Sequence, residues 1–154
     1  MDYVGSVGIA GGVVSMWDPS VFEAEESQKD VNFLLIRGRL KGSGEKINVM
    51  NVYAPQSSAS KAILWSKIEG LVNAHQGMWL IMGDFNVVRV PEERRNSVFK
   101  AGQARVFNEF IHNSGLIEYG MKDRQFTCSR DNGRKLMGRR MCFLPKSSNL
   151  FVAG

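Results

Sequence analysis

The sequence lacks the features that assign a chain to several common classes of protein. It has only two cysteines and two histidines, too few for a disulfide framework, and no group of these residues has the spacing of a zinc site. No apolar run approaches the ~20 residues that a membrane-spanning helix needs. The first residues hold no basic segment followed by a continuous apolar block. We therefore expect no secretory signal, no membrane partner and an intracellular chain.

Internal repeats, low-complexity tracts and long linkers are also absent, so we expect residues 1–154 to form a single domain. The hydrophobic share of 44% and the charged share of 23% are close to the averages of globular proteins, which argues against disorder. A chain of this length buries roughly 70% of its unfolded surface on folding. One well-packed core is therefore expected.

Positive charge is concentrated in the last fifth of the sequence. From Lys122 to the end there are eight basic and two acidic residues, whereas residues 1–121 are almost neutral. A basic segment suits a polyanionic partner such as nucleic acid. A solvated hairpin surface explains the same charges, and on charge alone it is the preferred interpretation.

Hydrophobic periodicity predicts an α/β fold with a mixed sheet. Residues 47–53 alternate apolar and polar side chains, which is typical of a half-buried strand, and residues 78–82 form a continuous apolar run that suits burial on both faces. Ser57 or Ser58 caps a helix between them, so this span predicts a βαβ unit with parallel strands. The other expected elements are strands at 13–17, 31–36 and 126–130, a second helix at 103–113, and a hairpin turn at 131–133.

The sharpest local feature is Gly83-Asp84-Phe85-Asn86, directly after the buried strand. Sheets of α/β proteins place ligands beyond the carboxyl ends of their strands. There Asp84 presents a carboxylate and Asn86 a neutral donor and acceptor, a pair that can orient a water and steady an anionic oxygen. An ordinary polar turn, in which Asp and Asn bond their own backbone, explains the four residues equally well. Taken alone, the ordinary turn is preferred.

Two further segments strengthen the functional interpretation. Residues 51–56 end the neighbouring strand, so Tyr53 and Gln56 place a phenol and an amide at the same sheet edge. Residues 89–99 form a polar loop after the second strand. Each has a plain structural explanation, since a tyrosine can anchor a strand end and a polar loop can simply be solvated.

Together these segments resemble the endonuclease/exonuclease/phosphatase superfamily. The resemblance is to the endonuclease domain of plant non-LTR (LINE-type) retrotransposons and their remnants in host genomes, and it covers most of the chain from about Gly8 to Leu144. Each motif is weak alone, but their order and spacing are specific. The matching motifs are residues 51–55, 79–86, 87–97, 107–111, 115–118, 125–127 and 129–133.

The resemblance implies a four-layer α/β sandwich and Mg²⁺-dependent hydrolysis of phosphodiester bonds in DNA. By position, Asp84 would orient or deprotonate the attacking water and Asn86 would bind the scissile phosphate. Tyr53 would contact the phosphate or the developing charge, and Gln56 would lie on the phosphate side. In-line phosphoryl transfer of this kind gains most of its rate from positioning and charge neutralisation.

The sequence also departs from the family's pattern. The family's early Asn and metal-binding Glu precede the stretch matched by residues 8–12, and its Ser-Asp-His segment comes after the last match. The resemblance therefore implies a partial sandwich, truncated at both ends. Arg140, Met141 and Cys142 stand where the family has Leu-Asp-Arg, so we expect the C-terminal arm to shift or fray. His75 and His112 match no catalytic position, and we expect surface or half-buried helix residues.

Asp84 is then the only family carboxylate in the chain. Mg²⁺ typically takes one or two carboxylates with waters and phosphate, and losing several members of one catalytic set removes nearly all of the rate. We therefore expect no metal ligands and an inactive, nuclease-derived domain whose ancestral partner is DNA. An active Mg²⁺-dependent endonuclease and a non-catalytic nucleic-acid-binding module that uses the basic C-terminal segment remain as alternatives. Missing outer strands would leave an open sheet edge, which predicts self-association.

Overall fold

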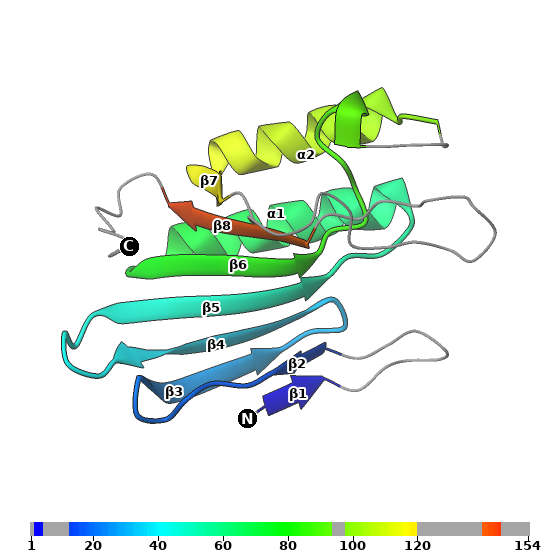
Figure 1. Cartoon of the computed structure of the whole chain (residues 1–154). Coiled ribbons are helices and arrows are strands. Elements are labelled where there is room, and N and C mark those ends of the chain that lie inside the picture. Colours follow the sequence, from blue (N-terminus) through cyan, green and yellow to red (C-terminus); the bar gives the residue numbers. More distant parts are fainter. Residues whose placement is uncertain (1, 5–12, 94–97, 120–139, 146–154) are drawn as a thin grey trace.

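The computed structural model describes residues 2–4, 13–93, 98–119 and 140–145 (Figure 1). A six-stranded mixed sheet carries two helices on one face, and a two-stranded sheet contacts strands of its other side. No helix in the described part of the chain is long and apolar enough to span a membrane. In chain order the elements are β1 (Asp2–Val4), β2 (Val13–Ser15), β3 (Phe22–Lys29), β4 (Phe33–Leu40), β5 (Lys46–Tyr53), α1 (Ser58–Ala74), β6 (Met78–Asp84), the 3-10 helix η1 (Pro91–Glu93), α2 (Ala101–Asn113), β7 (Leu116–Tyr119) and β8 (Arg140–Pro145).

The strand order of the large sheet is β3-β4-β5-β6-β8-β7. Strands β5 and β6 are parallel and α1 connects them, while the other neighbouring pairs are antiparallel. This confirms the βαβ unit and the mixed sheet expected from the sequence. The solitary parallel pair brings the carboxyl ends of two adjacent strands to one edge, which is where α/β sheets carry their sites.

Helix α1 begins where the serines predict. The Ser57 side chain is the N-cap and accepts a hydrogen bond from the Ser60 amide at 3.5 Å. The buried residues of the helix recur every three or four positions, which places them on the face that lies against the sheet. They are Lys61, Leu64, Trp65 and Ile68.

Aromatic side chains from three elements form the centre of the core beneath the helices. The Trp65 ring lies 4.9 Å from the Phe107 ring, 5.2 Å from the Phe110 ring and 5.9 Å from the Phe85 ring, measured between centroids. Offset or tilted rings at these separations add attraction beyond the burial of their area. Trp65 of α1 therefore joins α2 to the turn that follows β6.

The opposite face of the sheet has its own apolar cluster. Leu34 and Ile36 of β4 are buried there with Val13 and Phe22, because successive residues of a strand point to opposite faces. The half-buried Tyr53 ring packs against this second cluster, with Trp17 and Ile47.

Strand β3 was not expected from the sequence. Seven of its eight side chains are polar or exposed, and it has a register shift between Ala24 and Glu26, so it lacks the alternation that marks a strand. Its charges make pairs across to β4, where the Arg39–Glu25 distance is 2.8 Å and the Arg37–Glu26 distance is 2.5 Å. Exposed charge and a bulge are also the usual protection of an outer strand against pairing with another chain.

The C-terminal arm corrects one expectation and leaves another outside the described residues. The segment Arg140–Pro145, expected to shift or fray, forms β8 and pairs with both β6 and β7. Backbone hydrogen bonds on both sides of a strand do not depend on side-chain identity, so the replaced residues do not prevent this pairing. The expected strand at 126–130 and turn at 131–133 lie outside the described residues.

Replacing Trp65 by alanine tests the aromatic centre of the core. We expect a loss of about 3–5 kcal/mol in the free energy of unfolding, because a large buried side chain leaves a cavity among rings from several elements. The measurement is urea denaturation followed by circular dichroism. Ile63→Ala on the exposed side of α1, where the side chain is 71% exposed, is the matched control and should stay within ~0.5 kcal/mol of the parent. Equal losses in the two variants would contradict this account.

Candidate active site

Tyr53 and Asp84 lie side by side at the carboxyl ends of β5 and β6. They are direct partners in the parallel register, and the two strands end at the same edge of the sheet (Figure 1). Partners in neighbouring strands share a face, so both residues belong to the face opposite the helices. The structure therefore brings together two of the predicted site residues, both half-buried.

The turn after β6 holds the third. The Asp84 Oδ1 atom accepts a hydrogen bond from the Asn86 amide at 2.9 Å, and Asn86 has a left-handed backbone with φ of 50°. Asparagine is among the few residues that adopt this conformation readily. The polar-turn interpretation is thus correct in its geometry, and it occupies only one oxygen of the Asp84 carboxylate among the described residues.

Asn86 also ties the two strand ends together. Its Nδ2 atom donates to the carbonyl oxygen of Ala54 at 2.6 Å, and the Ala54 amide donates to the carbonyl oxygen of Asp84 at 2.8 Å. An amide nitrogen carries two hydrogens, so one N–H and the side-chain oxygen of Asn86 are left for a ligand within the described part of the chain.

Tyr53 and Gln56 differ in how firmly they are held. The Tyr53 amide donates to the Asn32 carbonyl at 2.8 Å, and the Asn32 side-chain amide donates to the Tyr53 carbonyl at 3.1 Å. Asn32 therefore holds both the backbone N–H and the backbone carbonyl of Tyr53. Gln56 is exposed in the connection between β5 and α1, outside this set of hydrogen bonds.

Lys61 belongs to the site, although sequence reasoning missed it. Its side chain is only 3% exposed, and its Nζ atom lies 2.5 Å from the carbonyl oxygen of Asn86. It also donates to Oε1 of Gln103 in α2, at 3.4 Å. The signal was present in the sequence, because position 61 falls on the apolar stripe one turn before Leu64 and Trp65.

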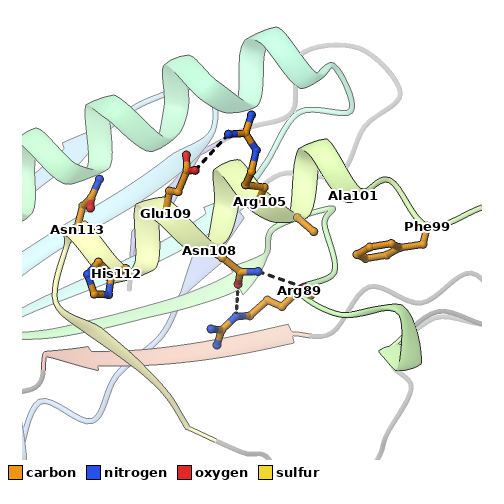
Figure 2. A pocket seen from close by; sticks show the side chains of 9 residues that line it. Arg89, Phe99, Ala101, Arg105, Asn108, Glu109, His112 and Asn113 are labelled. Atoms are coloured by element: carbon orange, nitrogen blue, oxygen red, sulfur yellow. Dashed lines mark hydrogen bonds and ion pairs between the residues drawn. The ribbon is translucent and has the colours of Figure 1, made fainter.

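Side-chain hydrogen bonds hold the loop after β6, which distinguishes it from a merely solvated loop. Arg89 donates from Nε to Oδ1 of Asn108 at 2.7 Å and from a terminal nitrogen to Oε2 of Glu118 at 2.6 Å. The Arg89 amide donates to the buried Glu93 carboxylate at 2.8 Å. Figure 2 shows Arg89 and Asn108 in a groove of about 520 Å³ along α2, with Phe99 at one end. These contacts connect the loop to α2 and β7; residues 94–97 lie outside the described part.

The residues that the structure describes do not form a metal site by themselves. Across 13–93 and 98–118, no three His, Cys, Asp or Glu side chains come close enough to share one. Mg²⁺ prefers carboxylate oxygens, and Asp84 is the one carboxylate at this edge among the positions carried over from the resemblance. His75, half-buried at the end of α1, and the exposed His112 lie on helix ends, as predicted.

Comparison with solved structures identifies the fold. The endonuclease domain of TRAS1, a telomere-specific non-LTR retrotransposon, superimposes with a TM-score of 0.54 at 13% identity, over 75% of this chain and 51% of that domain. An endonuclease/exonuclease/phosphatase family protein from Bacteroides thetaiotaomicron gives 0.54 at 12% identity, over 83% and 53%. The 3′ phosphatase NExo from Neisseria, bound to a product DNA hairpin, gives 0.53 at 14% identity, over 73% and 52%.

This is the endonuclease/exonuclease/phosphatase fold. The chain spans about half the length of the solved structures that it matches. No protein-family model matches the sequence, and no curated protein matches it either.

Replacing Gly83 by alanine tests the close approach of the two strand ends. Gly83 has φ of 131°, and a Cβ atom there would lie 2.0 Å from the carbonyl oxygen of Val52. We expect a loss of about 2–4 kcal/mol in the free energy of unfolding, from backbone strain and overlap with β5. Thermal and urea unfolding provide the measurement.

Gly70→Ala is the matched control. A Cβ atom at Gly70, inside α1, would meet nothing within 4 Å. Alanine should therefore stabilise the helix by up to ~1 kcal/mol. An unfolding free energy of the Gly83 variant equal to that of the parent would show that the strand ends do not constrain this position.

Proposed function

We propose that this chain is a nuclease-type phosphodiesterase domain of non-LTR retrotransposon origin, of the plant LINE type, whose β5–β6 edge faces a DNA phosphate. The observation that carries the proposal is the cluster at one sheet edge, where Tyr53 and Asp84 are register partners and Asn86 is hydrogen-bonded to Asp84. The fold shared with a retrotransposon endonuclease and with a DNA-bound phosphatase supports it.

We assign each side chain a role that uses the atoms not engaged in the contacts described above. The second oxygen of Asp84 orients or deprotonates a water, since the first is bonded to the Asn86 amide. The remaining N–H of Asn86 donates to a phosphate oxygen. The Tyr53 phenol contacts the phosphate or the charge that develops on it, and the exposed Gln56 lies on the phosphate side.

We further propose that the 154 residues alone do not hydrolyse DNA, and that the ancestral reaction was Mg²⁺-dependent, as the family resemblance implies. Positioning and charge neutralisation supply most of the rate of phosphoryl transfer. Asp84, the one carboxylate carried over from the resemblance, provides positioning but little neutralisation. A site that retains some members of a catalytic set keeps very little of the full rate.

A plasmid-nicking assay with Mg²⁺ at micromolar protein tests this part of the proposal. We expect the parent and Asp84→Ala to convert supercoiled plasmid at the same background rate, because the remaining groups cannot stabilise the transition state. Nicking by the parent that the Asp84 variant loses would overturn the proposed inactivity and at the same time establish the site.

A non-catalytic nucleic-acid-binding module is the second candidate, favoured by the eight basic residues between Lys122 and the C-terminus. Binding through these side chains would release counterions from DNA, so the affinity for a labelled duplex should fall about tenfold or more between 50 and 200 mM salt. Changing Arg139 and Arg140 to glutamine should flatten that dependence, while Asn86→Ala should leave its slope unchanged. Salt-independent binding, or no binding at all, discards this candidate.

Self-association through an open sheet edge stays a prediction. The exposed Glu23, Glu25 and Glu26 oppose it at β3, because a second copy would bring like charges together. We place any such contact at the short outer strand β7.

A further inference from the structure

A lysine interrupts the apolar face of α1. Leu64, Trp65 and Ile68 share this face with Lys61, and all four side chains are buried. A leucine or methionine at position 61 would extend the stripe against the core at no electrostatic cost. An ammonium group taken out of water is unfavourable unless hydrogen bonds in the fold compensate it. The position therefore calls for an explanation other than packing.

The contacts of Lys61 point to the turn after β6. Its Nζ atom lies 2.5 Å from the carbonyl oxygen of Asn86 and 3.4 Å from Oε1 of Gln103. Gln103 in turn donates from Nε2 to the Ser58 hydroxyl. The ammonium group thus joins α1, α2 and the turn at one point, and its bond to Asn86 is the charge-assisted kind, which is the stronger class.

The turn is held on its remaining sides by the strands. The Asn86 amide bonds the Asp84 carboxylate, and the Asn86 side chain bonds the Ala54 carbonyl. The Asn86 backbone is left-handed, with φ of 50°, so its carbonyl points away from the direction that a continuing strand would give it. Lys61 holds the carbonyl of Asn86 from the side of α1.

We propose that Lys61 is a positioning residue that fixes the orientation of Asn86, and through it of Asp84, toward a bound phosphate. This rests on the proposed function, because it takes the β5–β6 edge to be the phosphate site. The same positive charge also raises the electrostatic potential at the turn, which favours an anion there. The lysine is retained for the site and not for the stability of the core.

The test compares Lys61→Met with the parent in two measurements. In the first, NMR follows the exchange rate of the Asn86 backbone N–H and the shifts of its side-chain NH₂. We expect exchange to become about tenfold faster in the variant, since the bond that holds the turn is gone. In the second, fluorescence anisotropy measures the affinity for a labelled DNA duplex at fixed salt, with Asn86→Ala as the reference. We expect Lys61→Met to weaken this affinity about tenfold, as the loss of a supporting side chain does at other sites.

Lys41→Met is the matched control, because Lys41 is exposed in the β4–β5 turn and the substitution removes the same charge. Because Lys41 lies at the other end of β5, this variant should report only the loss of DNA affinity that comes from the change in net charge, without changing Asn86 exchange. A merely structural role for Lys61 would lower the melting temperature and leave the Asn86 resonances of the folded protein in place. That result overturns the proposal.

Two outcomes separate this proposal from the proposed function. If Asn86→Ala binds DNA like the parent, the phosphate site fails, whereas faster Asn86 exchange in Lys61→Met would still establish the link between lysine and turn. If Asn86→Ala weakens binding and Lys61→Met does not, the phosphate site stands and Lys61 does not position it. If the methionine variant does not fold, Lys61→Gln is measured in the same way. Glutamine keeps a neutral N–H donor at position 61 but removes the charge. Unchanged Asn86 exchange and unchanged DNA affinity in this variant would overturn the role of the charge.

Discussion

The parallel pairing of β5 and β6 is the constraint on which the other features of this molecule depend. It sets Tyr53 beside Asp84, and it requires glycine at position 83 because β5 passes too close for a side chain. It also requires the α1 crossover, since parallel strands cannot be joined by a tight turn. Helix α1, which makes the connection, packs Trp65 against the core and places Lys61 against the turn after β6. Core and site are consequently products of one strand pairing.

An apolar cluster and a polar cluster lie next to each other where α1 reaches the ends of β5 and β6. Rings of Trp65, Phe85 and Phe107 exclude water from one side of the turn, and the polar groups of Asp84 and Asn86 lie on the other. Hydrogen bonds in such surroundings are stronger than in water, and they cost more when left unmade. The turn between them is held by bonds to both strands and to the helix, so its shape is specified more tightly than that of an ordinary surface loop.

Sequence reasoning located the elements whose periodicity is strong and missed those held by charge or by distant partners. The Ser57 cap, the stripe of α1 and the apolar run of β6 each carry a local signal, so the βαβ unit and the Tyr53–Asp84–Asn86 edge could be placed in advance. Strand β3 could not, because glutamates that pair with Arg37 and Arg39 hide its alternation. The short β7 has too few residues for a pattern. Lys61 went unnoticed because a lysine on an apolar stripe is usually taken for a solvent-exposed neighbour, although its spacing placed it in the core.

The position of β8 has a consequence for the order in which this sheet can form. β8 lies between β6 and β7, yet it follows both in the sequence, so β7 lacks its partner in the described sheet until β8 arrives. During synthesis the outer side of β6 stays unpaired while α2 and β7 emerge from the ribosome. This side of β6 forms its backbone hydrogen bonds only when residues 140–145 pair with it. Late closure of an apolar strand by a distant segment is slow and leaves the nascent chain open to misassembly. Completion of the sheet, and with it the rigidity of the strand that carries Asp84, therefore waits until residues 140–145 have been synthesised.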